Sequence, residues 1–335
     1  MTQTNRQWLL ARRPRGAVSD DDFKFEHGEV PTPADGEVVV RTRYISMDPT
    51  NRAWMNEQPT YMEPIPLGAP MRAFVMGEVV ASASDKFAEG DKVTGIGGWC
   101  DYFKAPAGTL SRLPAIPGIT GKEVFGIYSI VGPTAYFGMH DIGRPKIGET
   151  LVVSGAAGAV GSLAGQFGKF YGCRVIGIAG GREKCGWVVN DFGMDAAIDY
   201  KSEDVAARLD ELCPDGIDIY FDNVGGDILD AALARMNVYG RIVQCGAISM
   251  YNAEGPTPGP SNYLNIVIRR LTVQGFVILD YFDRYPEAYR ALTTLRKQGR
   301  LEWKFDEFEG LDNALDALRS LFTGGNTGKV ILEVD

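Results

Sequence analysis

The segment at residues 152–161, VVSGAAGAVG, has the residue types and spacing of a phosphate-binding turn. Small residues let bare backbone approach a pyrophosphate, and a helix that begins there offers unpaired N–H groups and the positive end of its dipole. Ala156 stands where a G-x-G-x-x-G motif has its first glycine, while Gly158 and Gly161 keep the later two. We therefore expect this turn to cradle a dinucleotide. The residues expected to form it are Gly155, Ala156, Ala157, Gly158, Ala159, Val160 and Gly161.

The residues after the second expected strand bear on which dinucleotide binds. Residues 173–179, CRVIGIA, are typical of a buried strand, and folds that bind NAD place an acidic residue at the end of this strand to accept the ribose 2′-hydroxyl. Here the strand is followed by Gly180 and then by Arg182 and Lys184, with no carboxylate at the strand end. This pattern favours NADP(H), although Glu183 could neutralise Lys184 and both cations could also be a solvated first helical turn.

A second half of the same pattern follows along the chain. Residues 216–223 and 240–249 predict two more strands, residues 227–236 an amphipathic helix between them, and residues 271–279 a sixth strand. Cofactors lie across the carboxyl ends of such strands, so the residues there are candidate walls of the nicotinamide pocket, or ordinary loop residues. These candidates are Asn223, Cys245, Gly246, Ala247, Ile248, Phe276 and Val277.

The flanking regions have a different pattern and predict a second domain. Up to about residue 128, short β runs broken by Gly and Asp indicate a small twisted β-barrel, and residues 123–143 predict helices that link the two domains. Residues 310–335 predict a helix, a Gly-rich turn and a final strand. We expect a substrate domain at 1–128, an α/β doubly wound nucleotide-binding domain at 129–298, and a return to the first domain at 299–335.

Composition narrows the class of protein. The formal net charge is −9, which argues against a nucleic-acid binder, and no apolar run approaches the roughly 20 residues of a membrane span. The 5 cysteines have no C-x-x-C spacing, which is typical of reduced thiols in the cytoplasm and makes a metal site unexpected.

Several motifs together give the chain a resemblance to a known family. The segments AAGAVG, FDNVGG, ISMYN, GFVIL and GGNTGK, in this order, resemble the medium-chain dehydrogenase/reductase superfamily. Within it, the chain resembles the zinc-independent branch of leukotriene/prostaglandin reductases and alkenal/curcumin double-bond reductases. The resemblance implies a Rossmann domain beside a GroES-like twisted β-barrel. It also implies metal-free, NADPH-dependent reduction of a carbon–carbon double bond conjugated to a carbonyl.

The resemblance also implies roles for individual residues. Lys184 and Tyr200 match positions that contact the 2′-phosphate, and Asn326, with Gly328 in the same turn, matches a position near the cofactor. Tyr251, in ISMYN, matches a tyrosine placed at the nicotinamide and the substrate. Its hydroxyl either donates a hydrogen bond to the enolate formed on hydride transfer or contacts the nicotinamide ribose.

The substrate side departs from the family pattern. The family often reads S-x-D-P-Y-M-R where this chain has SMDPTNR, with Thr50 and Asn51 in place of tyrosine and methionine. The candidate pocket residues are Asn51, Tyr61, Thr134 and Tyr251. We expect a hydrophobic enone as substrate.

Two other functions remain open from the sequence, a NADPH:quinone oxidoreductase and a non-catalytic NADPH-binding protein. The expected partner is a second copy of the chain, because the sixth strand could extend a sheet across a two-fold axis.

Overall fold

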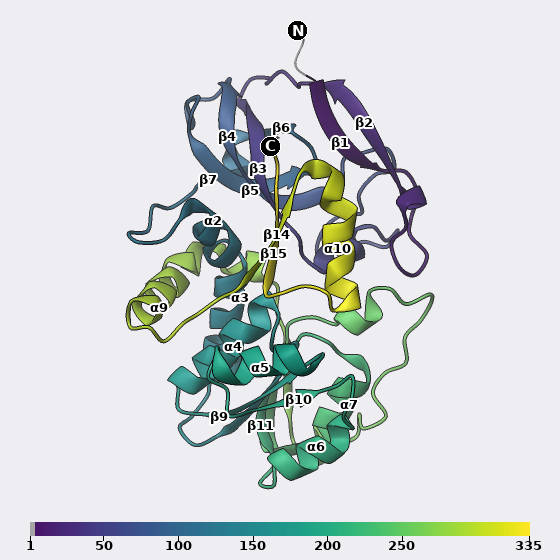
Figure 1. Ribbon diagram of the computed structural model, residues 1–335, viewed down its shortest axis with the longest axis vertical. Helices are drawn as coiled ribbons and strands as arrows, with labels where there is room; N and C mark the ends of the chain where they lie inside the picture. The colour runs from purple at the N-terminus through teal and green to yellow at the C-terminus, as the bar shows by residue number, and fades with distance from the viewer. Residues whose placement is uncertain (1–3) are drawn as a thin grey trace. The chain divides into compact units, whose positions relative to one another are not determined.

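The computed structural model describes residues 4–335 and divides into two compact units (Figure 1). Unit 1 contains the described residues up to Ser129 together with Phe305–Asp335, and unit 2 is Ile130–Lys304. The sequence predicted boundaries at residues 128 and 298. In the structure the segment from 299 to Lys304 belongs to unit 2.

Unit 1 is built on a seven-stranded sheet with the order β14-β15-β3-β4-β5-β7, in which β6 also pairs with β3. Pairing is antiparallel except between β14 and β15, which run parallel. Val38 and Val40 of β3 join the main core cluster of unit 1, because the pleat of a strand sends every second side chain to the same face, and Val39 between them is buried as well. The strands are β3 (Glu37–Ser46), β4 (Arg72–Ser82), β5 (Lys92–Gly98), β6 (Tyr102–Pro106), β7 (Ser111–Arg112), β14 (Phe305–Glu309) and β15 (Lys329–Glu333).

A separate hairpin and several short helices complete unit 1. The hairpin of β1 (Thr4–Leu10) and β2 (Phe23–Glu29) forms isolated β-bridges with the rest of the unit, Gln7 to Cys100 and Leu9 to Pro70, and its side chains Leu10 and Phe23 pack in the main core. Helix α10 buries its apolar face in the same core as the sheet. The helices are η1 (Asp20–Asp22), α1 (Thr50–Trp54), η2 (Ala107–Thr109), α2 (Gly121–Glu123), η3 (Val124–Tyr128), η7 (Leu311–Asn313) and α10 (Ala314–Thr323).

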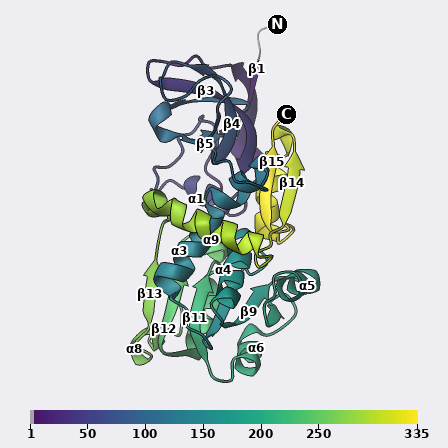
Figure 2. The same cartoon turned by 90° about the vertical axis from the view of Figure 1, so that its left-hand side faces the viewer.

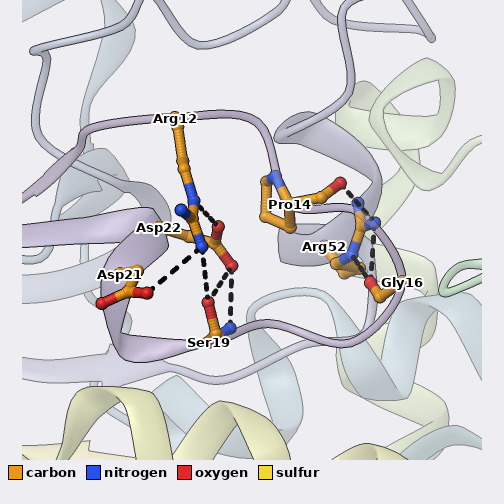
Figure 3. Close-up of polar contacts among 7 residues, drawn as sticks. All are labelled: Arg12, Pro14, Gly16, Ser19, Asp21, Asp22 and Arg52. Atoms are coloured by element: carbon orange, nitrogen blue, oxygen red, sulfur yellow. Dashed lines mark hydrogen bonds and ion pairs between the residues drawn. The ribbon is translucent and has the colours of Figure 1, made fainter.

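Two buried cations hold the short helix α1 in unit 1. The Arg52 guanidinium donates to the carbonyl oxygens of Pro14 and Gly16, at 3.2 and 3.0 Å from Nη2 (Figure 3). These bonds attach α1 to the loop between β1 and η1. The Lys329 ammonium, 1% exposed, donates to Met47 O at 2.8 Å and to Asp48 Oδ1 at 2.7 Å. Burial lowers the pKa of Lys329, and the Asp48 charge opposes this effect.

Unit 2 is a parallel six-stranded sheet with the order β10-β9-β8-β11-β12-β13, in which the chain steps outward from β8 in both directions. This order is that of a doubly wound dinucleotide-binding domain, so the predicted fold class is confirmed. The strands are β8 (Thr150–Ser154), β9 (Arg174–Ala179), β10 (Ala196–Asp199), β11 (Ile217–Asp222), β12 (Met236–Gln244) and β13 (Thr272–Gly275).

Helices cover both faces of this sheet. Helices α3 and α4 pack together against one face (Figure 2), where a Cβ at Gly168 would meet Leu151 and Val175. Helices α6 and α7 share the core of the other face, which contains Tyr220 and Ile242. The helices of unit 2 are α3 (Val131–Phe137), η4 (Gly138–Gly143), α4 (Ala159–Phe170), α5 (Arg182–Asn190), α6 (Val205–Leu212), α7 (Gly226–Arg235), η5 (Ile248–Met250), α8 (Asn265–Ile268), η6 (Ile278–Arg284) and α9 (Tyr285–Lys297).

The sixth strand is shorter than the sequence predicted. Among the described residues its one neighbouring strand is β12, whose final residue Gln244 pairs with Gly275. Residues beyond Gly275 have no partner strand, so the backbone leaves the sheet at Phe276 and turns into η6.

Candidate active site

The glycine turn lies between the end of β8 and the start of α4 and is shaped by backbone packing. Gly155 has a φ of 61°, a conformation that residues with a Cβ rarely adopt. A Cβ at Gly161 would overlap the Gly155 carbonyl oxygen and lie 2.8 Å from its carbon. The first turn of α4 therefore packs directly on the turn backbone, and its first N–H groups have no partner within the helix. This is the close approach that a pyrophosphate-binding turn requires.

The remaining predicted turn residues are divided between core and surface. Ala156 is fully buried and Ala157 is 5% exposed, so their side chains pack inside the unit. Gly158 is the N-cap of α4, and Ala159 and Val160, in its first turn, are partly exposed. An anion at this helix end would meet backbone amides and not side-chain charge.

The end of β9 carries the residues predicted to contact a 2′-phosphate. A Cβ at Gly180 would lie 2.8 Å from Tyr200 Cε1, so only glycine lets the Tyr200 ring lie against the strand end. Lys184 is in the first turn of α5 and Tyr200 follows β10, so both are at the same edge of the sheet. Asp199 accepts a hydrogen bond from the Gly181 amide at 2.6 Å, and this bond is the main cause that lowers the pKa of the carboxyl.

A buried carboxylate, Asp222, organises the carboxyl ends of the three central strands. It is 0% exposed at the end of β11 and accepts hydrogen bonds from Ser154 Oγ of β8 at 2.9 Å and from Gln244 Nε2 of β12 at 3.1 Å. The neighbouring Asn223 donates from Nδ2 to Ser154 O at 2.7 Å and from its amide to Ser154 Oγ at 2.9 Å. Asn223 is thus fixed beside the glycine turn.

Sequence reasoning missed this network. The signal was present, because Ser154 and Asp222 are polar residues that each follow a run of apolar residues at the end of a strand. The carboxyl ends of neighbouring parallel strands meet at one edge of a sheet, so such residues face one another.

The loop after β12 carries Tyr251. The amides of Cys245 and Gly246 donate to Asp222 O at 2.9 and 3.0 Å, which anchors the start of the loop. The Ala247 amide donates to Tyr251 Oη at 3.3 Å, so this hydroxyl accepts a hydrogen bond from its own loop. Burial raises the pKa of the Cys245 thiol to about 12, which makes it a poor nucleophile.

The other predicted residues of unit 2 lie on separate elements. Thr134, in α3, donates from its hydroxyl to Ile130 O at 2.7 Å, one helical turn earlier. Phe276 packs edge-on against Tyr281 with ring centroids 6.1 Å apart, and Val277 follows it before η6. Ile248 begins the short helix η5 that leads to Tyr251.

In unit 1, the predicted pocket residue Asn51 lies inside the unit. Asn51 is 0% exposed, and its side chain bonds to the Asp48 amide at 2.8 Å and to Arg72 O at 3.1 Å. Both ends of the amide are used inside the unit, where Asn51 supports α1. Asn326 donates from Nδ2 to Gly328 O at 3.1 Å, within the turn before β15.

Tyr61 is the predicted pocket residue that unit 1 presents at its surface. It is 50% exposed, stacks edge-on against Trp54 at 6.3 Å, and its hydroxyl lies 2.5 Å from Thr50 Oγ1. Thr50 is the position where the family pattern has a tyrosine, so a phenol from a different segment is held beside that position.

The described part of the chain has neither a cluster of metal ligands nor a membrane-spanning helix. Among residues 4–335, no group of three or more His, Cys, Asp or Glu side chains is arranged to hold a metal ion. No helix in the same range is long and apolar enough to cross a membrane.

Comparison with known proteins identifies both parts of the chain. Residues 6–113 match the family model described as the N-terminal domain of oxidoreductase, and residues 159–294 match the model described as zinc-binding dehydrogenase. The chain is 40% identical to the NADPH-dependent curcumin reductase of Escherichia coli, over 99% of this chain and 97% of that protein. It is 38% identical to the NADP⁺-dependent 2-alkenal reductase of Nicotiana tabacum, over 99% of this chain and 98% of that protein.

A solved structure matches as closely. CurA from Vibrio vulnificus in complex with NADPH superposes with a TM-score of 0.93 at 40% identity, over 98% of this chain and 99% of that one. Together with the order of the sheet and the packing of the glycine turn, these similarities show that the chain belongs to the medium-chain dehydrogenase/reductase family, in its zinc-independent double-bond reductase branch.

Proposed function

We propose that this protein is an NADPH-dependent reductase of the carbon–carbon double bond of α,β-unsaturated aldehydes and ketones. The observation that carries the proposal is the similarity, over 99% of the chain, to both a curcumin reductase and a 2-alkenal reductase. The substrates in the names of these two relatives, curcumin and a 2-alkenal, differ in size, but both contain a carbon–carbon double bond conjugated to a carbonyl.

The cofactor proposal is supported by the backbone of unit 2. The close packing of α4 on Gly155 leaves a turn in which a bare backbone and a helix N-terminus can meet a pyrophosphate. The strand end at Gly180 lacks a side chain that would occupy the place of a 2′-phosphate, and Lys184 supplies a positive charge nearby in sequence. Tyr200 lies against Gly180 and offers a hydroxyl at the same strand end.

Tyr251 is proposed as the group that stabilises the developing enolate. Bound NADPH would supply the hydride that reduces the β carbon of the enone. The Tyr251 oxygen accepts from the Ala247 amide, so its own proton has to point toward a different acceptor. A phenol donor oriented in this way can hold negative charge on a carbonyl oxygen, an effect typically of about 3 kcal/mol in the transition state.

In unit 2, Thr134 is proposed as a substrate contact in addition to Tyr251, and in unit 1, taken by itself, Tyr61 is proposed as a substrate contact. The hydroxyls of Tyr61 and Thr134 each have a partner in their own unit, Thr50 and Ile130 respectively, which fixes their orientation. A hydrophobic enone is the expected ligand. Asn51 is left out of this set because it is buried.

The proposed assembly is a homodimer in the cytoplasm. Within residues 4–335 the edge strand β13 pairs with β12 alone, and all four of its residues are exposed, including Val273 at 44%. An exposed strand edge with an apolar residue is a site where a second copy can add its own strand. All five cysteines are free thiols, as in a reducing compartment.

The function is tested by following NADPH oxidation with a 2-alkenal, a curcuminoid and a simple quinone, with NADH in parallel. We expect turnover of the enal or the curcuminoid with NADPH, and a saturated carbonyl as product. Activity with the quinone alone would indicate a quinone oxidoreductase instead. Tight NADPH binding without turnover of any of the three would indicate a binding protein.

Two variants test the assigned residues. Lys184→Ala should weaken NADPH binding and leave NADH binding nearly unchanged, and equal losses for both cofactors would refute the 2′-phosphate contact. Tyr251→Phe should lower kcat more than it weakens NADPH binding, because it removes only the hydroxyl. An unchanged kcat would refute the donor role.

A further inference from the structure

The buried carboxylate Asp222 has an unusual set of partners. Four donors meet at its Oδ1: Ser154 Oγ at 2.9 Å, Tyr220 Oη at 3.0 Å, and the amides of Val224 and Gly225 at 3.0 and 2.9 Å. Among residues 4–335, it takes part in no ion pair with Lys, Arg or His. The charge is therefore balanced by oriented neutral donors, which also fix the positions of the three segments that carry them.

The other carboxylate oxygen, Asp222 Oδ2, has a different role, because its partner Gln244 also contacts the loop after β12. Gln244 Nε2 donates to Asp222 Oδ2 at 3.1 Å and to Gly246 O at 2.8 Å. A primary amide carries two N–H groups on one nitrogen, so one side chain can serve both acceptors at once. Gln244 is thus a bridge between the buried carboxylate and the loop after β12.

The same loop positions the Tyr251 hydroxyl. Residues 245 and 246 are tied to Asp222 O by their amides, Gly246 O is held by Gln244, and the next amide, that of Ala247, donates to Tyr251 Oη at 3.3 Å. The peptide group between residues 246 and 247 therefore contacts Gln244 on its oxygen and Tyr251 on its nitrogen. A rotation of this peptide would break both contacts together, because the group is planar.

We propose that Asp222 and Gln244 are positioning residues that orient the 246–247 peptide and, through it, the Tyr251 hydroxyl. This inference rests on the proposed function, in which Tyr251 donates to the substrate. The side chain of Gln244 touches neither substrate nor cofactor in this role. It sets the direction of one amide, and the amide sets where the phenol proton points.

The test is a double-mutant cycle with Gln244→Met and Tyr251→Phe. Methionine keeps the length of glutamine and removes both donors. We expect Gln244→Met to lower kcat for a 2-alkenal roughly tenfold, in the range that small misplacements of a catalytic group produce. NADPH affinity should change less than twofold, and the substitution should have almost no further effect in the Tyr251→Phe background.

Ser249→Ala is the matched control. Its hydroxyl donates to Val224 O and so links the same two segments without contacting Asp222, Gln244 or Gly246. This variant should keep the wild-type kcat. An equal loss in Ser249→Ala would show that any weakening of the loop lowers activity, and would overturn the inference.

Further outcomes separate this inference from the proposed function. If Tyr251→Phe lowers kcat and Gln244→Met does not, the positioning role is wrong and the donor role survives. If Gln244→Met lowers kcat by the same factor in both backgrounds, the amide does not act through Tyr251. If Tyr251→Phe has no effect, the donor role fails, and the inference fails with it.

Folding is checked by the melting temperature of each variant. Should Gln244→Met be unstable, Gln244→Asn keeps the amide but is one methylene shorter, so it can reach only one of the two acceptors. The same criteria apply to it, and Asp222→Asn extends the cycle to the other end of the bridge, since an amide nitrogen at Oδ2 would face the Gln244 nitrogen.

Discussion

The packing of α4 on the glycine turn makes Gly161→Ala an informative perturbation. The added Cβ would overlap the Gly155 carbonyl oxygen and lie 2.8 Å from its carbon, whereas ordinary contacts begin at 3.4 Å. The obstacle is backbone, so it cannot be relieved by a change of rotamer. The helix start and the turn must separate by more than half an ångström at that carbon, and this gap lies where the pyrophosphate is proposed to bind.

The expected energies follow from three contributions. Overpacking costs about 1–3 kcal/mol, and alanine in place of glycine inside a helix returns about 1 kcal/mol, so the loss in free energy of unfolding should be about 0–2 kcal/mol. Binding should suffer more. Loss of a single amide hydrogen bond to a charged phosphate costs about 1.5–3 kcal/mol, which corresponds to a roughly 10- to 100-fold increase in the Kd for NADPH.

The control is Gly165→Ala, one helical turn further along α4. Its Cβ would overlap only the end of the Met194 side chain, which is flexible and can move aside. Both variants gain the same helix propensity, so their difference isolates the turn. NADPH titration by fluorescence and urea unfolding would be run on both. Equal Kd values for Gly161→Ala, Gly165→Ala and wild type would refute the assignment of this turn as the pyrophosphate site.

Three further predictions concern unit 1. Lys329→Met should lower the free energy of unfolding by about 3 kcal/mol because it leaves the Asp48 carboxylate without its cation, and adding Asp48→Asn should restore part of this loss in urea unfolding. Cys100 is 1% exposed and its thiol pKa is raised from 9.0 to about 12, so between pH 9 and 12 the unfolded chain loses a proton that the folded chain keeps. Stability should therefore fall by about 1.4 kcal/mol per pH unit from this thiol as pH rises through that window, and Cys100→Ala should show a correspondingly shallower decline. Arg52→Lys should speed proteolytic cleavage of the loop at Gly16, since one ammonium cannot serve all the acceptors of a guanidinium; unchanged cleavage would mean that the loop is held by other contacts.

The glycine turn and the doubly wound sheet could be predicted from the sequence because both depend on local packing. The glycine turn was recognisable because α4 packs on the Gly155 backbone, which leaves no room for a Cβ at Gly161. This requirement does not depend on the rest of the fold. The doubly wound sheet was recognisable because buried parallel strands alternate with amphipathic helices along the chain. Both features depend on residues close together in sequence.

Long-range pairing explains what was missed. Strand β14 reads FDEFE, with acidic residues that indicate no buried strand, and it forms because β15 lies beside it. The burial of Asn51 and Arg52 in the five-residue helix α1 was not predicted either, because their partners, among them Arg72 O and Gly16 O, lie on distant segments. The roles of Asp222 and Gln244 depend on three strands meeting at one edge.

The two-part composition of unit 1 has a consequence for biosynthesis. Its sheet needs β15, which pairs with both β3 and β14, while unit 2 is complete by Lys304. During translation, β3 to β7 are made before unit 2 and β15 is made after it, so the sheet of unit 1 can be completed only once unit 2 has been synthesised. The strand that finishes the sheet also carries Lys329, whose ammonium binds the chain at Met47, more than 280 positions earlier. A chain that stalls before residue 329 would therefore expose an unpaired β3 edge to aggregation.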